Sequence, residues 1–447
     1  METTDARQQS IAQSRSFFKL ALIWIRSPVA ILFVVSFGTL WIGLDATRLW
    51  DRDEPRNARC AAEMLERADW VVPMFNHQLR THKPILLYWM QMVCFSVFGE
   101  TDFAARAASA FMASLAVFAT FWLGKSLVDA NAGFWSAVVL ATSLMFVVAG
   151  RAATPDACLV ATSTLGIVAL VLHWQSAAFK FTKYAVAGYV ALGFAILAKG
   201  PVGIVLPMMV VGLWGISQSL PLSTASTARS SFLSWFSFLS VRAAIEDVRC
   251  IVAVRSANVA GSSENARYFR GAKGDIRGAK GDNGHRVSFV VFFQILWSVT
   301  RRLCVVQGLV VAIAVAAPWY IWVGIRTDGE WLRGFFFEHN LGRAMSAMEG
   351  HRGGWWFYPA ASLVGLFPWS LMLFPIGLWV SKHVRKSIAS PAIQLGLIWM
   401  GVYMAVFSIA KTKLPSYITP CYPGAALLIG GFLSHLEIGR ASCRERV

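Results

Sequence analysis

Long apolar runs separated by short polar loops make up most of this chain. A helix needs about 20 mostly apolar residues to cross the hydrocarbon core of a bilayer, with about 17 as the lower limit. The runs that reach this length are 27–44, 104–123, 133–149, 156–173, 184–200, 201–218, 303–325, 359–380, 392–410 and 417–433. Two further apolar runs, 84–98 and 287–299, are shorter. The pattern predicts an all-α polytopic membrane protein with about ten spans.

The composition supports this prediction. Hydrophobic residues make up 56% of the chain and charged residues 15%, and the mean hydropathy is +0.54. A soluble domain with this balance would lack the polar surface needed to cover itself. The formal net charge of +17 comes mainly from short loops between apolar runs, so it indicates contact with membrane lipids and no nucleic-acid partner. The seven cysteines are scattered and contain no CxxC pair, which favours neither a disulfide framework nor a thiolate metal site.

Basic residues close to the first apolar run predict the orientation of the chain. Cytoplasmic loops carry an excess of Lys and Arg. The N-terminal segment 1–26 contains Arg15, Lys19 and Arg26, so we expect it on the cytoplasmic side of the inner (plasma) membrane. The loop 45–103 is then expected on the outer side.

Lys125 is a second landmark that we expect in the cytoplasm. This requires an odd number of crossings between residues 83 and 125, so that 104–123 crosses the membrane and 84–98 does not. We expect 84–98 to form an interfacial or re-entrant helix. Continued alternation places the mixed polar motifs on the outer side and the short basic linkers on the inner side. The polar motifs are therefore expected to share one compartment, the periplasm or the exterior.

Two segments do not follow the regular pattern. The basic stretch 219–302 is expected to be a disordered cytoplasmic insert near anionic lipid. The terminal segment 438–447 looks like the translation of a sequencing-library adapter, and we expect it to be an artefact. The transmembrane domain itself is predicted to extend over 27–433.

The densest charge in the chain directly follows the first apolar run. Residues 51–57 contain two Asp, one Glu and two Arg, and charge beside a bilayer usually marks polar chemistry. Asp53 and Glu54 are adjacent, so on a helix they point about 100° apart and cannot both address one atom. One carboxylate could accept a proton or bind a metal while the other orients Arg56. The same residues could instead form a salt-bridged helix cap.

Cations recur at the predicted outer ends of the apolar runs. They are Lys83, Arg151, Lys199, Arg343, Lys411 and Lys413. Snorkelling to the headgroups explains any single one of them, but so many on the outer side contradict the positive-inside rule. A phosphate ligand accounts for the surplus, because Lys and Arg bind phosphate oxygens and stabilise a phosphate leaving group.

A later outer loop carries two histidines. His339 and His351, together with Glu338, could coordinate a divalent metal, although His-x11-His is not a zinc spacing. Interfacial histidines that form hydrogen bonds are the alternative.

Several short motifs occur in the order found in one known family. They are Asp-Glu-Pro-Arg (53–56), Ala-Glu-Met-Leu (62–65), Asp-Trp-Val-Val-Pro (69–73), His-Lys-Pro-Ile-Leu-Leu-Tyr-Trp (82–89), Phe-Ala-Ala-Arg (103–106), Arg-x-x-Thr-x-Asp (151–156), Ala-Lys-Gly-Pro (198–201), Pro-Trp-Tyr (318–320), His-Asn-x-x-Arg (339–343) and Lys-x-Pro-x-Tyr (413–417). The chain resembles the membrane glycosyltransferases typified by the aminoarabinose (lipid A) transferase, which are related to protein O-mannosyltransferases. The resemblance covers 27–433 apart from the insert at 222–300.

The resemblance implies a GT-C fold, which is a helical bundle with its site at the outer leaflet. It also implies an inverting transfer of sugar from a polyprenyl-phosphate donor to a lipid or cell-surface glycan acceptor. The alternative is a transporter or flippase of lipid-linked sugars, which would share the outer cations and broken helices. A transporter of this kind is expected to show paired motifs in two halves, and the sequence shows no such repeat.

By motif position, the resemblance implies that Asp53 is the catalytic carboxylate, with Arg56 as its neighbour. Lys83 becomes the donor-phosphate ligand and Asp156 a further acidic residue of the site. The later motifs add further site residues, namely His339, Asn340, Arg343 and Tyr417. The family usually has Glu, a metal ligand, where this chain has His82. Histidine also binds zinc, so a divalent metal (Zn, Mg or Mn) is a further expectation, with His82 as its candidate ligand.

Overall fold

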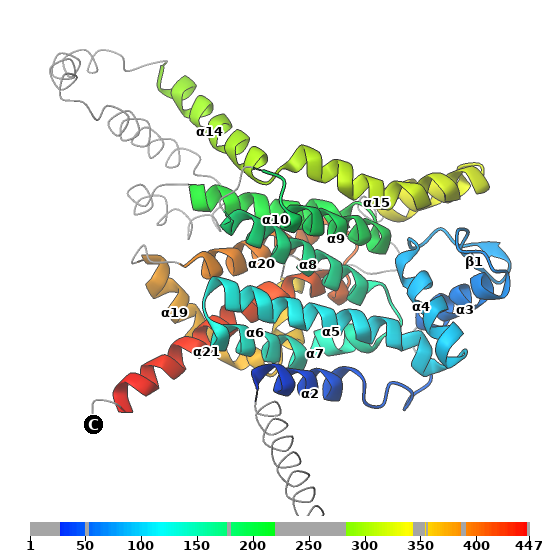
Figure 1. Ribbon diagram of the computed structural model, residues 1–447, viewed down its shortest axis with the longest axis horizontal. Coiled ribbons are helices and arrows are strands. Elements are labelled where there is room, and N and C mark those ends of the chain that lie inside the picture. The colour runs from blue at the N-terminus through cyan, green and yellow to red at the C-terminus, as the bar shows by residue number, and fades with distance from the viewer. Residues whose placement is uncertain are drawn as a thin grey trace, which may run out of the picture.

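The computed structural model describes residues 27–49, 53–176, 180–219, 283–342, 354, 356–385 and 390–444. Its helices lie side by side, with most of their axes close to horizontal in Figure 1. The elements are α2 (Pro28–Leu40), α3 (Asp53–Glu66), β1 (Met74–Phe75), β2 (Gln78–Leu79), α4 (Leu86–Phe98), α5 (Asp102–Leu127), α6 (Ala130–Thr142), α7 (Leu144–Arg151), α8 (Asp156–Gln175), α9 (Lys183–Lys199), α10 (Val202–Ser219), α14 (Asn283–Arg302), α15 (Val305–Arg326), α16 (Glu330–Arg333), the π-helix η2 (Gly334–Leu341), α18 (Phe357–Gly365), the 3-10 helix η3 (Trp369–Met372), α19 (Leu373–Arg385), α20 (Pro391–Ile409), the 3-10 helix η4 (Pro415–Cys421) and α21 (Tyr422–Arg444).

Short polar side chains begin several of these helices. Ser, Thr or Asp precedes the first residue of α2, α5, α6, α9 and α20, and its side chain accepts a hydrogen bond from a backbone N–H of the first turn. Such a cap satisfies a donor that has no partner within the helix. The first turn of each of these helices therefore has one unsatisfied N–H fewer, and apolar residues can follow it directly.

The count of about ten spans that the sequence predicted is not confirmed. Within the described residues, five helices are long and apolar enough to cross a membrane, namely α5, α8, α10, α15 and α20. The number rises to seven if the bent pairs α6–α7 and α18–α19 each count as one span. These pairs bend by 65° and 110°, the first at Ser143 and the second beside Pro368, which has no N–H to continue a helix. The hydropathy of a run depends on its apolar residues and does not reveal a bend between two helices within that run.

Helix α4 agrees with the prediction for residues 84–98. It has 13 residues and is too short to cross a hydrocarbon core of about 30 Å.

The prediction of a disordered insert at 219–302 is wrong for its last part, because residues 283–302 form helix α14. Residues 220–282 lie outside the described part of the chain.

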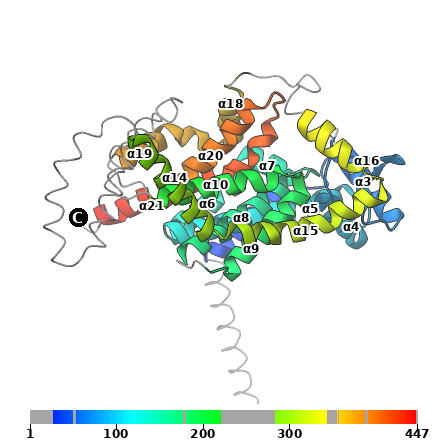
Figure 2. The same ribbon diagram turned by 90° about the horizontal axis from the view of Figure 1, so that it is seen from above.

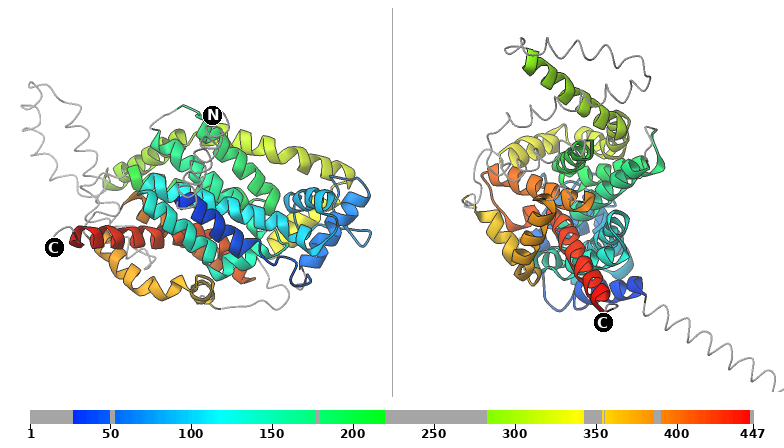
Figure 3. Two further views of the ribbon diagram at one scale, coloured as in Figure 1. Left: turned by 60° about the horizontal axis from the view of Figure 1, so that its bottom comes forward. Right: turned by 90° about the vertical axis from the view of Figure 1, so that its left-hand side faces the viewer.

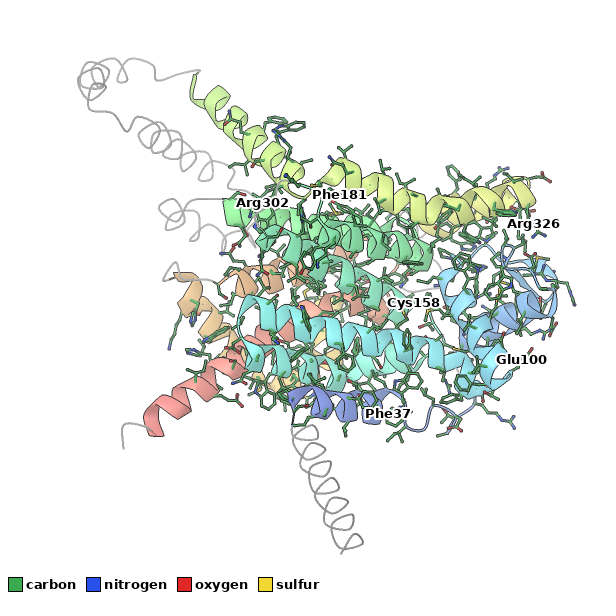
Figure 4. The ribbon with its side chains drawn as sticks, viewed as in Figure 1. Phe37, Glu100, Cys158, Phe181, Arg302 and Arg326 are labelled. Carbon is green, nitrogen blue, oxygen red and sulfur yellow. The ribbon has the colours of Figure 1, made fainter. Side chains whose placement is uncertain are left out.

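Polar loops gather at two opposite ends of the bundle. The strands and helices α3 and α4 lie at one end, whereas α19 and the last turns of α21 lie at the other (Figures 1 and 2). Glu100 and Arg326 are both at the first end, and Phe181 and Arg302 are both towards the second (Figure 4). This arrangement confirms that the loops around residues 100 and 326 share one side. Figure 3 shows α21 extending away from the strands.

Small residues allow the central helices to approach closely. Helix α5 buries a series of alanines, and a Cβ added at Gly124 would lie 2.8 Å from the Cα of Gly133 on α6. In lipid, helices associate through close packing and interhelical hydrogen bonds, so small residues at the contact are favourable.

We therefore expect Gly124→Leu to destabilise the protein by about 1–3 kcal/mol, the usual effect of overpacking. The midpoint of thermal unfolding in detergent measures this effect. Gly38→Leu on α2 is the matched control, because a Cβ there meets nothing within 4 Å. Equal midpoints for the two variants would contradict the close packing of α5 on α6.

Candidate active site

A buried ion pair fixes the start of α3. One edge of the Arg106 guanidinium binds both carboxylate oxygens of Glu54, with Nε–Oε1 at 3.0 Å and Nη2–Oε2 at 2.8 Å. Glu54 is 1% exposed and Arg106 is 4% exposed. Arg106 also donates to the carbonyl oxygens of Leu44, Thr47 and Arg48, which belong to the linker between α2 and α3. Arg106 therefore connects α5, this linker and α3.

The same carboxylate also holds the loop before α8. The backbone N–H of Ala153 donates to Glu54 Oε1 at 2.7 Å, and the Asn57 side-chain amide donates to the Ala153 carbonyl at 3.0 Å. Arg80 bridges Asn57 Oδ1 and the Tyr88 hydroxyl, each at 3.0 Å. Buried polar groups of this kind almost always form hydrogen bonds within the protein. The relative positions of α3, α4 and the start of α8 are consequently set by buried hydrogen bonds.

Four charged side chains meet at the end of the bundle that this network holds. Lys83 Nζ lies 3.9 Å from Asp53 Oδ2, and Lys199 Nζ forms an ion pair with Asp156. Lys83 also interacts electrostatically with Asp156. Asp53 is the most accessible of the four, with 46% of its side chain exposed against 14–17% for the others. The structure thus brings together four residues that the sequence assigned to one site.

Helix ends favour this placement of charge. Asp156 is the first residue of α8, and Lys199 is the last residue of α9. The positive end of a helix dipole stabilises a carboxylate, and the negative end stabilises an ammonium. The apolar runs predicted at 156–173 and 184–200 therefore place opposite charges at one end of the bundle.

The loop after α20 completes the cluster. Lys199 Nζ lies 5.1 Å from the centroid of the Tyr417 ring, and the Ser416 hydroxyl is hydrogen-bonded to Asp156. Tyr417 was predicted as a site residue. Ser416 was missed, and its only signal is its position within the Lys-x-Pro-x-Tyr motif.

Two predicted phosphate ligands form helix caps in this structure. Lys413 Nζ donates to the carbonyl oxygens of three residues, Phe407, Ser408 and Ala410, at 2.8–3.3 Å. Burial lowers the pKa of its ammonium group. The Arg151 guanidinium donates to the carbonyls of Thr39 and Gly43 at the end of α2.

Both cations thus satisfy C-terminal carbonyls, a frequent role for basic side chains. The geometry does not support phosphate binding by these two residues. Lys411 is exposed in the same loop as Lys413.

The roles of Glu54 and Arg56 also differ from the expectation. Arg56 is exposed, and the cation that Glu54 binds is Arg106 of the Phe-Ala-Ala-Arg motif. Glu54 therefore acts as a positioning residue, as in the salt-bridged alternative, and Asp53 is the carboxylate left to face a substrate. Cys60 on the same helix is not a nucleophile, because burial raises the pKa of its thiol to about 12.

The residues proposed for a metal only partly converge. The rings of His82 and His339 lie against each other, with their centroids 4.0 Å apart and their planes tilted by 32°. Within the described ranges, no three His, Cys, Asp or Glu side chains converge to hold an ion. The Asn340 side chain, Arg343 and His351 lie outside the described part. The described residues thus do not form a metal centre, and the divalent metal stays a prediction.

An apolar cavity of about 510 Å³ lies beside the charged cluster. Its walls come from α4, α5, α8 and α9, three of which carry Lys83, Asp156 and Lys199 at or next to their ends. Leu86, Thr162 and Phe194 line it within about two helical turns of these charges, and Thr162 is the one polar residue of the lining. A polar head at the cluster can therefore continue into an apolar chain.

The sequence of this chain is similar to those of known membrane glycosyltransferases. Residues 28–246 match the family model of dolichyl-phosphate-mannose-protein mannosyltransferases. The undecaprenyl phosphate-alpha-4-amino-4-deoxy-L-arabinose arabinosyl transferase of Pectobacterium carotovorum is 27% identical over 419 residues, which cover 93% of this chain and 60% of the relative. The Yersinia pestis protein of the same name is 25% identical over 410 residues, covering 90% and 58% of the two chains.

Two solved structures share the fold. ArnT from Cupriavidus metallidurans bound to undecaprenyl phosphate gives a TM-score of 0.64 at 22% identity, covering 91% of this chain and 59% of that one. The oligosaccharyltransferase of Archaeoglobus fulgidus in the apo form gives 0.53 at 12% identity, covering 94% and 52%.

The helical bundle with a charged cluster at one end thus shares its fold with these two proteins. The match to the mannosyltransferase family model and the similarity to the aminoarabinose transferases agree with the resemblance that the motifs indicated. The chain spans about 60% of the length of the curated relatives it matches.

We expect Arg106→Leu to cost about 3–5 kcal/mol of stability, because it leaves the Glu54 carboxylate buried without its partner. Glu66→Leu is the control, since Glu66 is 49% exposed and pairs with Arg59 on the surface of α3, and such pairs contribute about 0–1 kcal/mol. Unfolding of both purified variants in detergent gives the comparison. Similar losses would contradict the role assigned to the buried pair.

Proposed function

We propose that this chain is an inverting glycosyltransferase that moves a sugar from a polyprenyl-phosphate donor to a lipid or cell-surface glycan at the outer face of the inner membrane. The observation that carries the proposal is the cluster of Asp53, Lys83, Asp156 and Lys199 beside an apolar cavity. The names of the relatives, which specify an undecaprenyl-phosphate sugar and arabinosyl transfer, support this class of donor.

The two lysines provide the binding site for the donor phosphate. Lys83 and Lys199 both interact with Asp156, and ammonium groups bind phosphate oxygens by charge-assisted hydrogen bonds. A bound phosphate competes with the carboxylates for these ammonium groups. The contact between Lys83 and Asp53 is long at 3.9 Å, so Lys83 can leave Asp53 at little cost.

Asp53 is the residue placed to act on the acceptor. Its carboxylate is about half exposed, whereas Asp156 is ion-paired and Glu54 is buried. With a hydroxyl acceptor, Asp53 takes the proton while the acceptor oxygen bonds to the anomeric carbon. The bond from that carbon to the phosphate oxygen breaks, and its electron pair leaves with polyprenyl phosphate, stabilised by the lysines. Attack from the face opposite the phosphate inverts the anomeric centre.

The nature of the acceptor decides whether a base is needed. A phosphate acceptor, such as a phosphate group of lipid A, is already ionised and needs no proton acceptor. Asp53 then orients the acceptor or the sugar. In either case the lysines stabilise the same leaving group, so their role does not depend on the acceptor.

The apolar cavity accommodates part of the prenyl chain. It begins close to Lys83 and Lys199 and is lined almost entirely by apolar side chains. Burying isoprenoid methyl and methylene groups contributes about 25 cal/mol per Å² of apolar area. The cavity thus selects a donor whose phosphate is attached to a long apolar chain.

We expect Asp53→Asn to lower kcat by about 10²–10⁴-fold with a hydroxyl acceptor, while donor binding is retained. Transfer of labelled sugar from polyprenyl phosphate to membrane lipid, measured in proteoliposomes, tests this. Glu66→Gln on the exposed end of the same helix is the control and should behave like the parent chain. Translocation of the donor without transfer by the parent chain would instead favour a flippase.

We expect Leu165→Trp to fill the apolar cavity and raise KM for a long-chain donor about tenfold, with little change for a donor carrying a short prenyl group. Steady-state kinetics with the two donors measure the difference. Leu309→Trp on α15, where the residue is 38% exposed, is the control. An equal effect of Leu165→Trp on both donors would show that the chain does not occupy this cavity.

A further inference from the structure

A second cavity lies at the opposite end of the bundle from the charged cluster. It has a volume of about 510 Å³ and lies between α19 and α21, whose labels are at the left of Figure 1. On α19, Leu378, Trp379, Lys382 and His383 recur at the spacing of one helical face. Residues 432, 435 and 436 do the same on α21. The two faces are directed at each other across the cavity.

One side of this cavity is basic. The rings of His383 and His435 are 5.7 Å apart, and both lie against Trp379. Lys382 adds a cation, and no acidic residue lines the cavity in the described part of the chain. Glu437 follows His435 by two positions, about 200° around the helix, so it faces away. The cavity is therefore complementary to an anion.

The basic side also contains donors that lack acceptors. The indole N–H of Trp379 is buried and has no hydrogen-bond partner within the described residues. A buried donor without an acceptor costs about 1–3 kcal/mol. His383 Nδ1 lies 2.8 Å from the Trp379 carbonyl, which can only accept, so Nδ1 carries the proton in this contact. Phosphate oxygens would accept hydrogen bonds from the Trp379 indole N–H, the Lys382 ammonium group and a ring N–H of His435.

The other side of the cavity is apolar and reaches the outer surface of the bundle. Phe432 is buried, whereas Leu378 is 50% exposed and Leu436 is 40% exposed. An anion with an attached hydrocarbon chain would contact both the basic side and the apolar side of the cavity. A free inorganic ion would contact only the basic side. This end of the bundle also carries the basic linkers, which predict the cytoplasmic side, where anionic lipids attract Lys and Arg.

We propose that this cavity binds an anionic phospholipid of the cytoplasmic leaflet. The headgroup phosphate contacts Lys382, His435 and the Trp379 indole, and an acyl chain lies along Leu378 and Leu436. The bound lipid joins α19 to α21 and so stabilises the strongly bent pair of helices α18 and α19. This site is at the other end of the bundle from the proposed donor site and does not depend on transfer activity.

Native mass spectrometry of the full chain, released from nanodiscs of phosphatidylcholine and phosphatidylglycerol, tests the proposal. The parent chain should retain phosphatidylglycerol in preference to phosphatidylcholine. Lys382→Gln combined with His435→Gln should lower this retention by at least about tenfold, the effect of losing one charge-assisted contact. Lys180→Gln combined with Lys183→Gln removes two cations in the α8–α9 loop at the same end and should retain the lipid as the parent does.

Trp379→Phe gives a second test that keeps an aromatic ring at this position. It removes the indole N–H and makes the ring system smaller, and we expect it to lose phosphatidylglycerol by about tenfold. The midpoint of thermal unfolding without lipid checks that the variant folds. Unchanged retention in both Trp379→Phe and the Lys382–His435 variant would overturn the proposal. Equal thermal stabilisation by inorganic phosphate without lipid would also overturn it, because that would identify a site for a free anion.

Discussion

The ion pair between Glu54 and Arg106 is the interaction on which the rest of the site depends. Its two partners are almost completely buried, and each makes further hydrogen bonds to backbone groups around it. Through Arg106 the pair holds the linker between α2 and α3, and through Ala153 it holds the start of α8. Loss of one partner leaves an uncompensated charge in a medium of low dielectric constant, which is far more costly than loss of a surface pair. Asp53 and Asp156 are thus positioned by one buried contact.

The charged cluster and the apolar cavity form one continuous surface. Helices α4, α8 and α9 present their charged ends to the cluster and their apolar lengths to the cavity. A substrate that combines a phosphate with a long hydrocarbon chain needs both surfaces at the boundary of the membrane. The same combination of cations and apolar side chains recurs at the opposite end, between α19 and α21, where it fits a phospholipid.

Much of the site could be predicted from the sequence, because alternating apolar runs determine which helix ends lie together. Lys83, Asp156, Lys199 and Tyr417 are brought together in this way. The partners of other residues could not be predicted, because they depend on the reach of side chains in the folded protein. Arg151 and Lys413 cap the ends of α2 and α20, and Glu54 binds an arginine that lies 52 positions away. The predicted count of about ten spans is not confirmed, because the apolar runs at 27–44 and 184–200 form helices of 13 and 17 residues, which are shorter than the candidate spans.

A structure of the protein with a non-hydrolysable polyprenyl-phosphate sugar in a lipid nanodisc would test the central claim most directly. The account predicts that the phosphate lies between Lys83 and Lys199, that the anomeric carbon faces Asp53, and that the first isoprene units enter the cavity lined by Leu86 and Phe194. A phosphate bound away from both lysines, or a prenyl chain that leaves the cluster by another route, would contradict it.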